Sequence, residues 1–144
     1  MIDIIFENAI NLFQSVVVTA FLMASLGCKD KYNKKCTGII GIVITFIYLT
    51  VSNHIVFFES TGIYIYMVYS LIFSFLVLGG NVIEKIFYNV MMICCLAGSS
   101  LLGVGLISLV VKKDYLNTIP FGAVSRYISG ILVQILLIVF FCCL

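Results

Sequence analysis

The sequence predicts an all-α protein, a polytopic bundle of about five transmembrane helices. Three observations lead to this prediction. The chain is 63% hydrophobic and only 10% charged, its mean hydropathy is +1.26, and its apolar residues form five long runs. Eight basic and six acidic residues are too few to coat a soluble domain of this size. The net charge of +2 is small as well, so no nucleic-acid partner is expected.

The five runs are expected to be helices. Each approaches the roughly 20 residues that a helix needs to cross a hydrocarbon core of about 30 Å. β-branched residues are frequent, but the runs lack the alternation of barrel strands, and an open sheet would leave its backbone unpaired in lipid. Pro120 falls in the first turn of the last run, where its missing N–H costs little. The spans, which form one transmembrane domain over residues 1–144, are predicted at residues 4–26, 37–52, 62–78, 86–111 and 119–144.

A lysine-rich loop after the first run predicts the orientation. Lys and Arg beside a span resist translocation, so this loop is expected in the cytoplasm, with the N-terminus outside and the C-terminus inside. Lys85, after the third run, agrees with this orientation, whereas Lys112 and Lys113 then fall outside. The expected location is the plasma membrane, with the chain as a multi-pass protein. The loop lysines that carry the topology signal are Lys29, Lys31, Lys34 and Lys35.

Polar side chains in the first run recur on one helical face. Polar groups are costly in lipid and turn toward protein or water, so this face is expected to avoid lipid. Two interpretations stay open: the side chains pack against neighbouring helices, or they line a ligand site or cavity. The stripe comprises Asp3, Glu7, Asn11 and Gln14, which are separated by four, four and three residues, a helical spacing.

Arg126 lies in the outer third of the last span under this orientation, at a depth similar to that of Glu7. Three roles are open for it. It pairs with Glu7, as intramembrane charges often do; its planar guanidinium binds a ligand carboxylate; or it extends to the headgroups and binds lipid phosphate.

Aromatic residues also gather at the predicted outer side, near His54. Tyrosine belts at membrane interfaces are common, but the same rings offer area and hydrogen bonds to a hydrophobic peptide. The outer aromatic cleft predicted here comprises Phe57, Tyr64, Tyr66 and Tyr127.

The fourth run carries Ser99 and Gly103, a small-xxx-small pattern that lets two helices approach closely. Packing within the chain and a homodimer contact would both use this pattern.

The six cysteines do not indicate a metal or redox site. None has C-x-x-C spacing, only one histidine is present, and a thiol in an apolar run behaves as a small hydrophobe. A Cys/His peptidase is disfavoured because His54 falls outside while Cys28 and Cys36 fall inside. No metal, no cofactor and no enzymatic activity of this chain are therefore expected.

Several short motifs follow one another in a recognisable layout. The first run ends in Leu26-Gly27-Cys28-Lys29, and the third ends in Leu78-Gly79-Gly80-Asn81. Glu84-Lys85-Ile86-Phe87 then opens the fourth run, and Ser125-Arg126-Tyr127-Ile128 opens the fifth, which also contains Gln134. Over all 144 residues this layout resembles the N-terminal sensor region of Agr-type peptide-pheromone receptor histidine kinases, whose catalytic part is a GHKL-type ATPase domain.

The resemblance implies a quorum-sensing receptor of a two-component system. Such receptors bind a small secreted peptide, often cyclic, from outside and signal as homodimers through a cytoplasmic kinase to a response regulator. This chain has no phosphoacceptor histidine region and no ATP-binding boxes, so it would supply the input alone. The apolar end at residues 141–144 agrees with the front part of a longer protein.

The predicted function is thus a membrane-embedded sensor domain that detects an extracellular signal and relays it to a kinase absent from this chain. The alternative is a small transport or solute-binding membrane subunit, with Glu7, Asn11, Gln14 and Arg126 lining a solute site. A helix broken in mid-span would favour the alternative.

The pairing of Glu7 with Arg126 is testable by charge exchange. Glu7→Lys places two positive charges together and is expected to impair folding or signalling. Arg126→Glu in the double variant restores opposite charges and is expected to restore the yield of folded protein. If Glu7→Lys and Arg126→Glu, each made alone, fold and signal like the wild type, the pairing is wrong.

Overall fold

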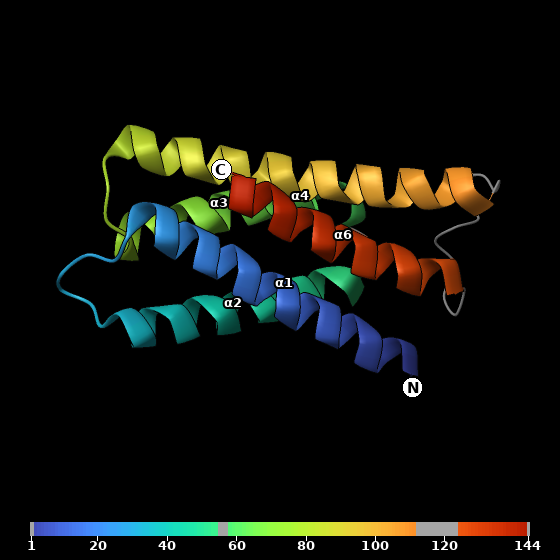
Figure 1. Ribbon diagram of the computed structural model, residues 1–144. Helices are drawn as coiled ribbons and strands as arrows, with labels where there is room; N and C mark the ends of the chain where they lie inside the picture. The colour runs from blue at the N-terminus through green and yellow to red at the C-terminus, as the bar shows by residue number, and fades with distance from the viewer. Residues whose placement is uncertain (1, 55–57, 112–123, 144) are drawn as a thin grey trace. The chain divides into compact units, whose positions relative to one another are not determined.

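The computed structural model describes residues 2–54, 58–111 and 124–143. Its helices are α1 (Ile2–Leu26), α2 (Lys34–His54), α3 (Phe58–Val77), α4 (Val82–Val111) and α6 (Val124–Cys143) (Figure 1). The predicted all-α fold is confirmed for these residues, in which one isolated bridge between Cys28 and Leu78 is the single strand-like feature. Residues 119–123, including Pro120, lie outside the described part of the chain.

Three helical segments are long and apolar enough to cross a membrane. They are Ile4–Leu26, Lys34–Ser52 and Val82–Ile107, while Gly62–Val77 and Tyr127–Cys143 are apolar but shorter. Length and composition are therefore compatible with a membrane protein.

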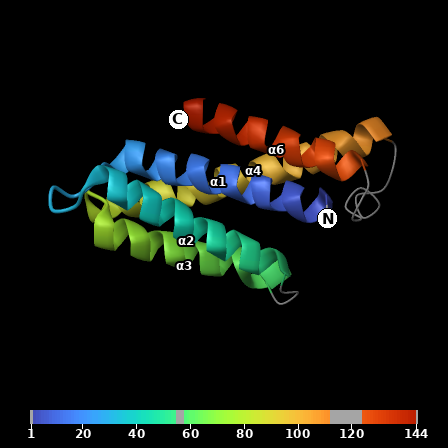
Figure 2. The same cartoon turned by 90° about the horizontal axis from the view of Figure 1, so that it is seen from below.

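The chain packs as two compact units. The first consists of Met1–Ile10 with Cys94–Leu144, and the second of Asn11–Ile93. In the second unit, α2 and α3 lie side by side and antiparallel (Figure 2). The loop after α1 and the turn after α3 lie at the same end of this unit (Figure 1), which we call the lysine end because it carries Lys29 and Lys85.

Polar caps explain why α2 and α4 begin before the apolar runs that predicted them. The side-chain oxygen of Asn33 accepts a hydrogen bond from the Lys35 N–H at 3.0 Å, which is the usual N-cap contact. Before α4, the Asn81 N–H donates to a carboxylate oxygen of Glu84 at 2.8 Å, as in a capping box.

Hydrogen bonds join the segment after α1 to the segment after α3. Gly27 ends α1 with a φ of +66°, a conformation that glycine adopts without strain. Its carbonyl accepts from the Gly79 N–H at 3.0 Å, and the Lys29 N–H donates to the Val77 carbonyl at 3.2 Å. Leu78, between these bonds, is fully buried. We call this pairing the α1–α3 clasp.

In the first unit, Gly103 of α4 faces α6. A Cβ built on Gly103 would lie 2.5 Å from a side-chain methyl of Val133 and 3.4 Å from the Val133 backbone nitrogen. Ser99, one turn earlier, is fully buried, and its hydroxyl donates to the Leu96 carbonyl at 3.0 Å. The small-residue pattern of α4 is thus used for packing within the chain.

The burial pattern of the described residues departs from that of a water-soluble protein, because many polar side chains are buried beside the apolar core. Large apolar side chains are exposed on every helix, for example Ile39 at 62%, Ile83 at 81% and Leu109 at 76%. A water-soluble monomer rarely exposes so much contiguous apolar surface. The buried polar side chains are Asn11, Ser15, Thr19, Thr37, Thr45, Ser70, Ser74, Lys85, Asn89, Ser99, Ser129 and Gln134.

The close contact of α4 with α6 predicts that alanine substitutions at two neighbouring glycines differ strongly in their effect on stability. Gly103→Ala is expected to lower stability by about 1–3 kcal/mol, because the new methyl group overlaps Val133. Gly105→Ala is the matched control, since nothing lies within 4 Å of its Cβ position, and it should be neutral or stabilising by up to about 1 kcal/mol. Thermal unfolding in detergent micelles measures both.

Val133→Ala should rescue Gly103→Ala, because it removes the overlapping methyl group. Equal losses for the two glycine variants, or no rescue, would contradict this packing.

Candidate functional site

The most developed polar and aromatic grouping in the structure lies between α2 and α3 in the second unit. Tyr48 of α2 stacks on Tyr66 and Tyr69 of α3, with ring centroids 5.4 Å and 6.2 Å away. Tyr66 and Tyr69 are 6.1 Å apart, and Phe73 extends the row 6.4 Å beyond Tyr69. The α3 members are three and four residues apart and so share one helical face. We call Tyr48, Tyr66 and Tyr69 the tyrosine cluster.

The three hydroxyl groups of the cluster differ in their partners. The Tyr48 hydroxyl donates to the Gly62 carbonyl at 2.5 Å, and the Tyr69 hydroxyl is 3.1 Å from the hydroxyl of Thr45. Tyr66 is only 5% exposed, and its buried hydroxyl has no hydrogen-bond partner in the described part of the chain. A buried polar group without a partner costs about 1–3 kcal/mol. This hydroxyl therefore has unused capacity to bind a polar group.

The tyrosine cluster lies well away from the lysine end. α2 begins at Lys34 beside the lysine loop, and Tyr48 lies roughly 20 Å further along the helix at 1.5 Å per residue. α3 runs in the opposite direction and reaches the lysine end only after Val77. If the lysine loop is cytoplasmic, the cluster belongs to the outer half of the spans.

The aromatic residues predicted to form one outer cleft differ in burial and in the unit to which they belong. Tyr64 is 69% exposed whereas Tyr66 is buried, because residues two apart in a helix point to nearly opposite sides. Tyr127 belongs to the first unit, where its ring meets Phe6 edge to face at 4.7 Å. Phe57 lies outside the described residues.

The polar stripe of α1 is partly buried. Asn11 is 5% exposed, while Glu7 and Gln14 are half-buried. The most deeply buried polar residues of the helix are Ser15 and Thr19, at 0% and 3%, which the sequence analysis missed. They lie four and eight residues after Asn11, which is a helical spacing. This spacing is the sequence signal that extends the polar stripe to small hydroxyl residues.

Chain neighbours of Glu7 and Arg126 contact each other in the first unit. The rings of Phe6 and Tyr127, the chain neighbours of these residues, contact each other. A Cβ built on Gly130 would lie 3.3 Å from the Phe6 ring. The side chain of Arg126 lies outside the described part, so the ion pair itself stays a prediction.

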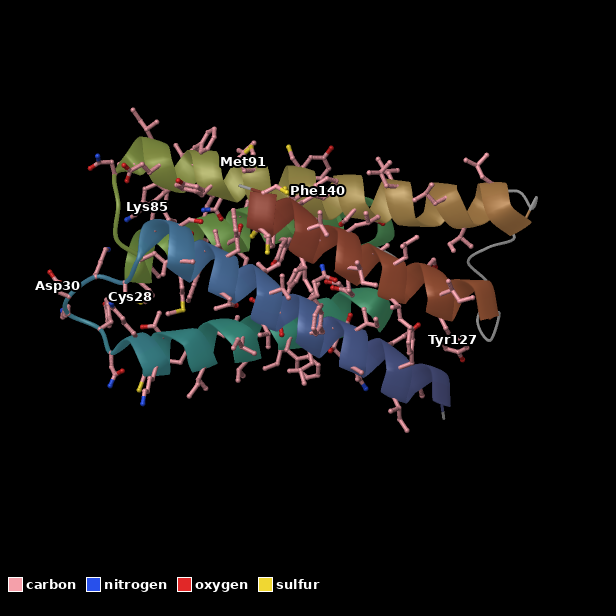
Figure 3. The ribbon with its side chains drawn as sticks, viewed as in Figure 1. Cys28, Asp30, Lys85, Met91, Tyr127 and Phe140 are labelled. Carbon is pink, nitrogen blue, oxygen red and sulfur yellow. The ribbon has the colours of Figure 1, made fainter. Side chains whose placement is uncertain are left out.

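At the lysine end, two lysines are held in place while the others are exposed. The Lys29 ammonium donates to the Phe75 and Leu76 carbonyls at 2.6 Å and 3.1 Å. Lys85 is 6% exposed, with its ammonium 5.4 Å from the centre of the Phe75 ring. Figure 3 shows Lys85 at the same end as Cys28 and Asp30. The exposed lysines are Lys31, Lys34 and Lys35.

A buried amide connects α3 to α4 near the same end. Asn89, fully buried, donates to the Ser74 hydroxyl at 2.9 Å and to the Lys85 carbonyl at 2.7 Å. Ser74 donates in turn to the Ser70 carbonyl at 2.8 Å. These bonds join the two helices through polar groups that neither helix exposes.

No chemistry of metals is indicated by the described side chains, among which no three His, Cys, Asp or Glu residues form a group that could hold an ion. No family model matches this chain, and no curated protein or solved structure matches it significantly.

The unpartnered hydroxyl makes the tyrosines unequal in their contribution to stability. Tyr66→Phe is expected to leave the unfolding temperature unchanged or to raise it, because it removes a buried polar atom and keeps the ring. Tyr48→Phe, the matched change, loses the bond to Gly62 and should cost about 0.5–1.5 kcal/mol. Thermal unfolding of both variants in the same micelles is the measurement. Equal losses of stability in the two variants would contradict an unpartnered hydroxyl at Tyr66.

Proposed function

We propose that the chain is the membrane-embedded sensor domain of a receptor in the plasma membrane. It detects a small extracellular peptide and relays the signal to a cytoplasmic kinase and its response regulator. The unpartnered, buried hydroxyl of Tyr66 within the tyrosine cluster is the observation that carries the ligand-binding part of this proposal.

Membrane embedding is supported by the exposed apolar surface together with the buried polar side chains. Side chains that face lipid gain nothing by being polar, whereas side chains between helices bond to one another or to backbone carbonyls. The Asn89–Ser74 bond and the back-bonded hydroxyls of Ser15 and Ser70 follow this rule. The lysine loop then lies in the cytoplasm, with the N-terminus outside and five spans in the bilayer.

The tyrosine cluster suits a peptide ligand for two reasons. Its rings offer a large apolar area, and tyrosine adds a hydroxyl that bonds to peptide carbonyl or N–H groups. The cluster also bridges α2 and α3, so a ligand that bonds to Tyr66 acts on the contact between two helices. A ligand that prefers one arrangement of that contact shifts its population, which is the physical requirement for relaying a signal.

Dimerisation, which a kinase-coupled receptor requires, needs a surface other than the small-residue face of α4. That face is taken by Val133 of α6. The exposed apolar side chains of the other helix faces are the surfaces that remain for a second copy.

A transport or solute-binding subunit is the alternative. A helix broken in mid-span would favour it, but α4, the glycine-containing candidate, is continuous from Val82 to Val111. The alternative therefore gains no support from this helix.

The proposal is testable by ligand-linked stabilisation of the chain in phosphatidylcholine nanodiscs. The probe is the low-molecular-mass peptide fraction of the medium in which the organism carrying the gene has grown. A ligand at a hundred times its Kd stabilises the folded protein by about 2.7 kcal/mol, so the unfolding temperature should rise in a saturable way. Tyr66→Phe is expected to reduce the rise, because it removes the hydroxyl that binds the ligand.

Tyr64→Phe is the matched control, since Tyr64 is exposed on the opposite side of α3 and should keep the full response. A response that is lost equally in the two variants would place the ligand elsewhere. No response of the wild type to any fraction would contradict the sensor function.

A further inference from the structure

The lysine end combines positive charge with exposed apolar side chains in a way that the sensor function does not explain. Five lysines and two acidic residues lie between Lys29 and Lys35 and between Asn81 and Lys85. One of the two carboxylates, that of Glu84, already accepts a hydrogen bond from the start of α4. This end therefore carries a surplus of positive charge.

Lys29 and Lys85 are the two lysines of this end with fixed positions. Both have neutral partners: Lys29 bonds to backbone carbonyls of Phe75 and Leu76, and Lys85 lies over the Phe75 ring. Both ammonium groups therefore lie beside the same residue, Phe75, one at its carbonyl and the other at its ring. An ammonium has three N–H donors, and Lys29 uses two of them, so one is left for another acceptor. Two cations beside one aromatic residue, with no carboxylate among the contacts described for them, attract an anion.

The surroundings of these lysines indicate what kind of anion fits. Phe75 and Leu76, whose carbonyls hold Lys29, expose 40% and 62% of their side chains. Ile86, next to Lys85, is 45% exposed. A free phosphate ion has no use for such apolar surface, whereas a phospholipid places its acyl chains against it and its phosphate beside the lysines.

The position of the site along the helices agrees with a lipid headgroup. The candidate span Ile4–Leu26 ends three residues before Lys29, and Lys85 lies in the first turn of the candidate span Val82–Ile107. The phosphates of a bilayer lie just beyond the hydrocarbon core, and a basic cluster at that depth attracts anionic lipids.

We propose that Lys29 and Lys85 form a binding site for the phosphate of an anionic phospholipid, with its acyl chains against Phe75, Leu76 and Ile86. Lys29 contacts the phosphate through its remaining N–H. Lys85, whose side chain is covered, acts through its charge. The bound lipid also fixes Lys29 on the end of α3, and so reinforces the α1–α3 clasp.

Native mass spectrometry of the chain released from nanodiscs tests this proposal. The nanodiscs contain phosphatidylcholine with either phosphatidylglycerol or no anionic lipid, and the readout is the relative affinity for phosphatidylglycerol. Each lysine near an anionic surface contributes about fivefold in affinity. Lys29→Gln with Lys85→Gln should therefore lower the preference about 25-fold.

Lys31→Gln with Lys34→Gln removes the same charge from exposed positions and is the matched control. It should lower the preference by clearly less than the first pair does, because it leaves the proposed contacts of Lys29 and Lys85 with the phosphate in place. Equal losses for the two pairs would show attraction to the charge of the whole loop and would overturn a defined site. A wild type with no preference for phosphatidylglycerol would also overturn it.

Two further arms keep the result interpretable. Inorganic phosphate added to pure phosphatidylcholine nanodiscs should not raise the unfolding temperature, and a rise equal to that given by phosphatidylglycerol would assign the site to free phosphate. Where the double variant does not fold, Lys85→Gln alone leaves the hydrogen bonds of Lys29 in place. An undiminished preference in that variant contradicts the proposal.

Discussion

The α1–α3 clasp is the constraint on which the second unit depends. Two helices that run in the same direction end beside each other, and backbone hydrogen bonds from Gly27, Lys29 and Gly79 join their ends. These bonds use backbone groups that a helix end otherwise leaves unpaired. They also bring the lysine loop to the start of α4. The position of Lys29 follows from this pairing, whereas Asn89 is held by its bonds to Ser74 and to the Lys85 carbonyl.

Buried polar side chains of the second unit are also paired by hydrogen bonds, within and between the helices. Ser15, Ser70 and Ser74 return their hydroxyls to carbonyls of their own helices, and Asn89 bonds to Ser74 across the helix pair. Each bond is modest in water, but the alternative in hydrocarbon is an unsatisfied group. Tyr66 is one of several departures from this rule: its hydroxyl, like the side-chain oxygens of Thr50, Ser52 and Asn89, is buried with no partner among the described residues. Tyr66 differs from the other three in that it lies within a cluster of aromatic rings.

Much of the fold could be predicted from the sequence, because the composition and the length of an apolar run are enough to predict a helix. The N-terminal limits of α2 and α4 were not, since they depend on the caps at Asn33 and Glu84. The tyrosine cluster was harder to predict from the sequence. Tyr66 was named, but its partner Tyr48 lies on another helix, and contacts across a hairpin have no signature in local spacing. Tyr64 and Tyr66, predicted together, differ greatly in exposure, because residues two apart in a helix point to nearly opposite sides.

The composition of the tyrosine cluster gives the protein an internal optical signal. The chain contains no tryptophan and eight tyrosines, so its ultraviolet emission comes from tyrosine. Three of these rings lie with centroids between 5.4 Å and 6.2 Å apart, a separation at which excitation passes readily from ring to ring. Their absorption and circular dichroism are therefore coupled. Any event that separates α2 from α3 changes the spectrum of the unlabelled molecule.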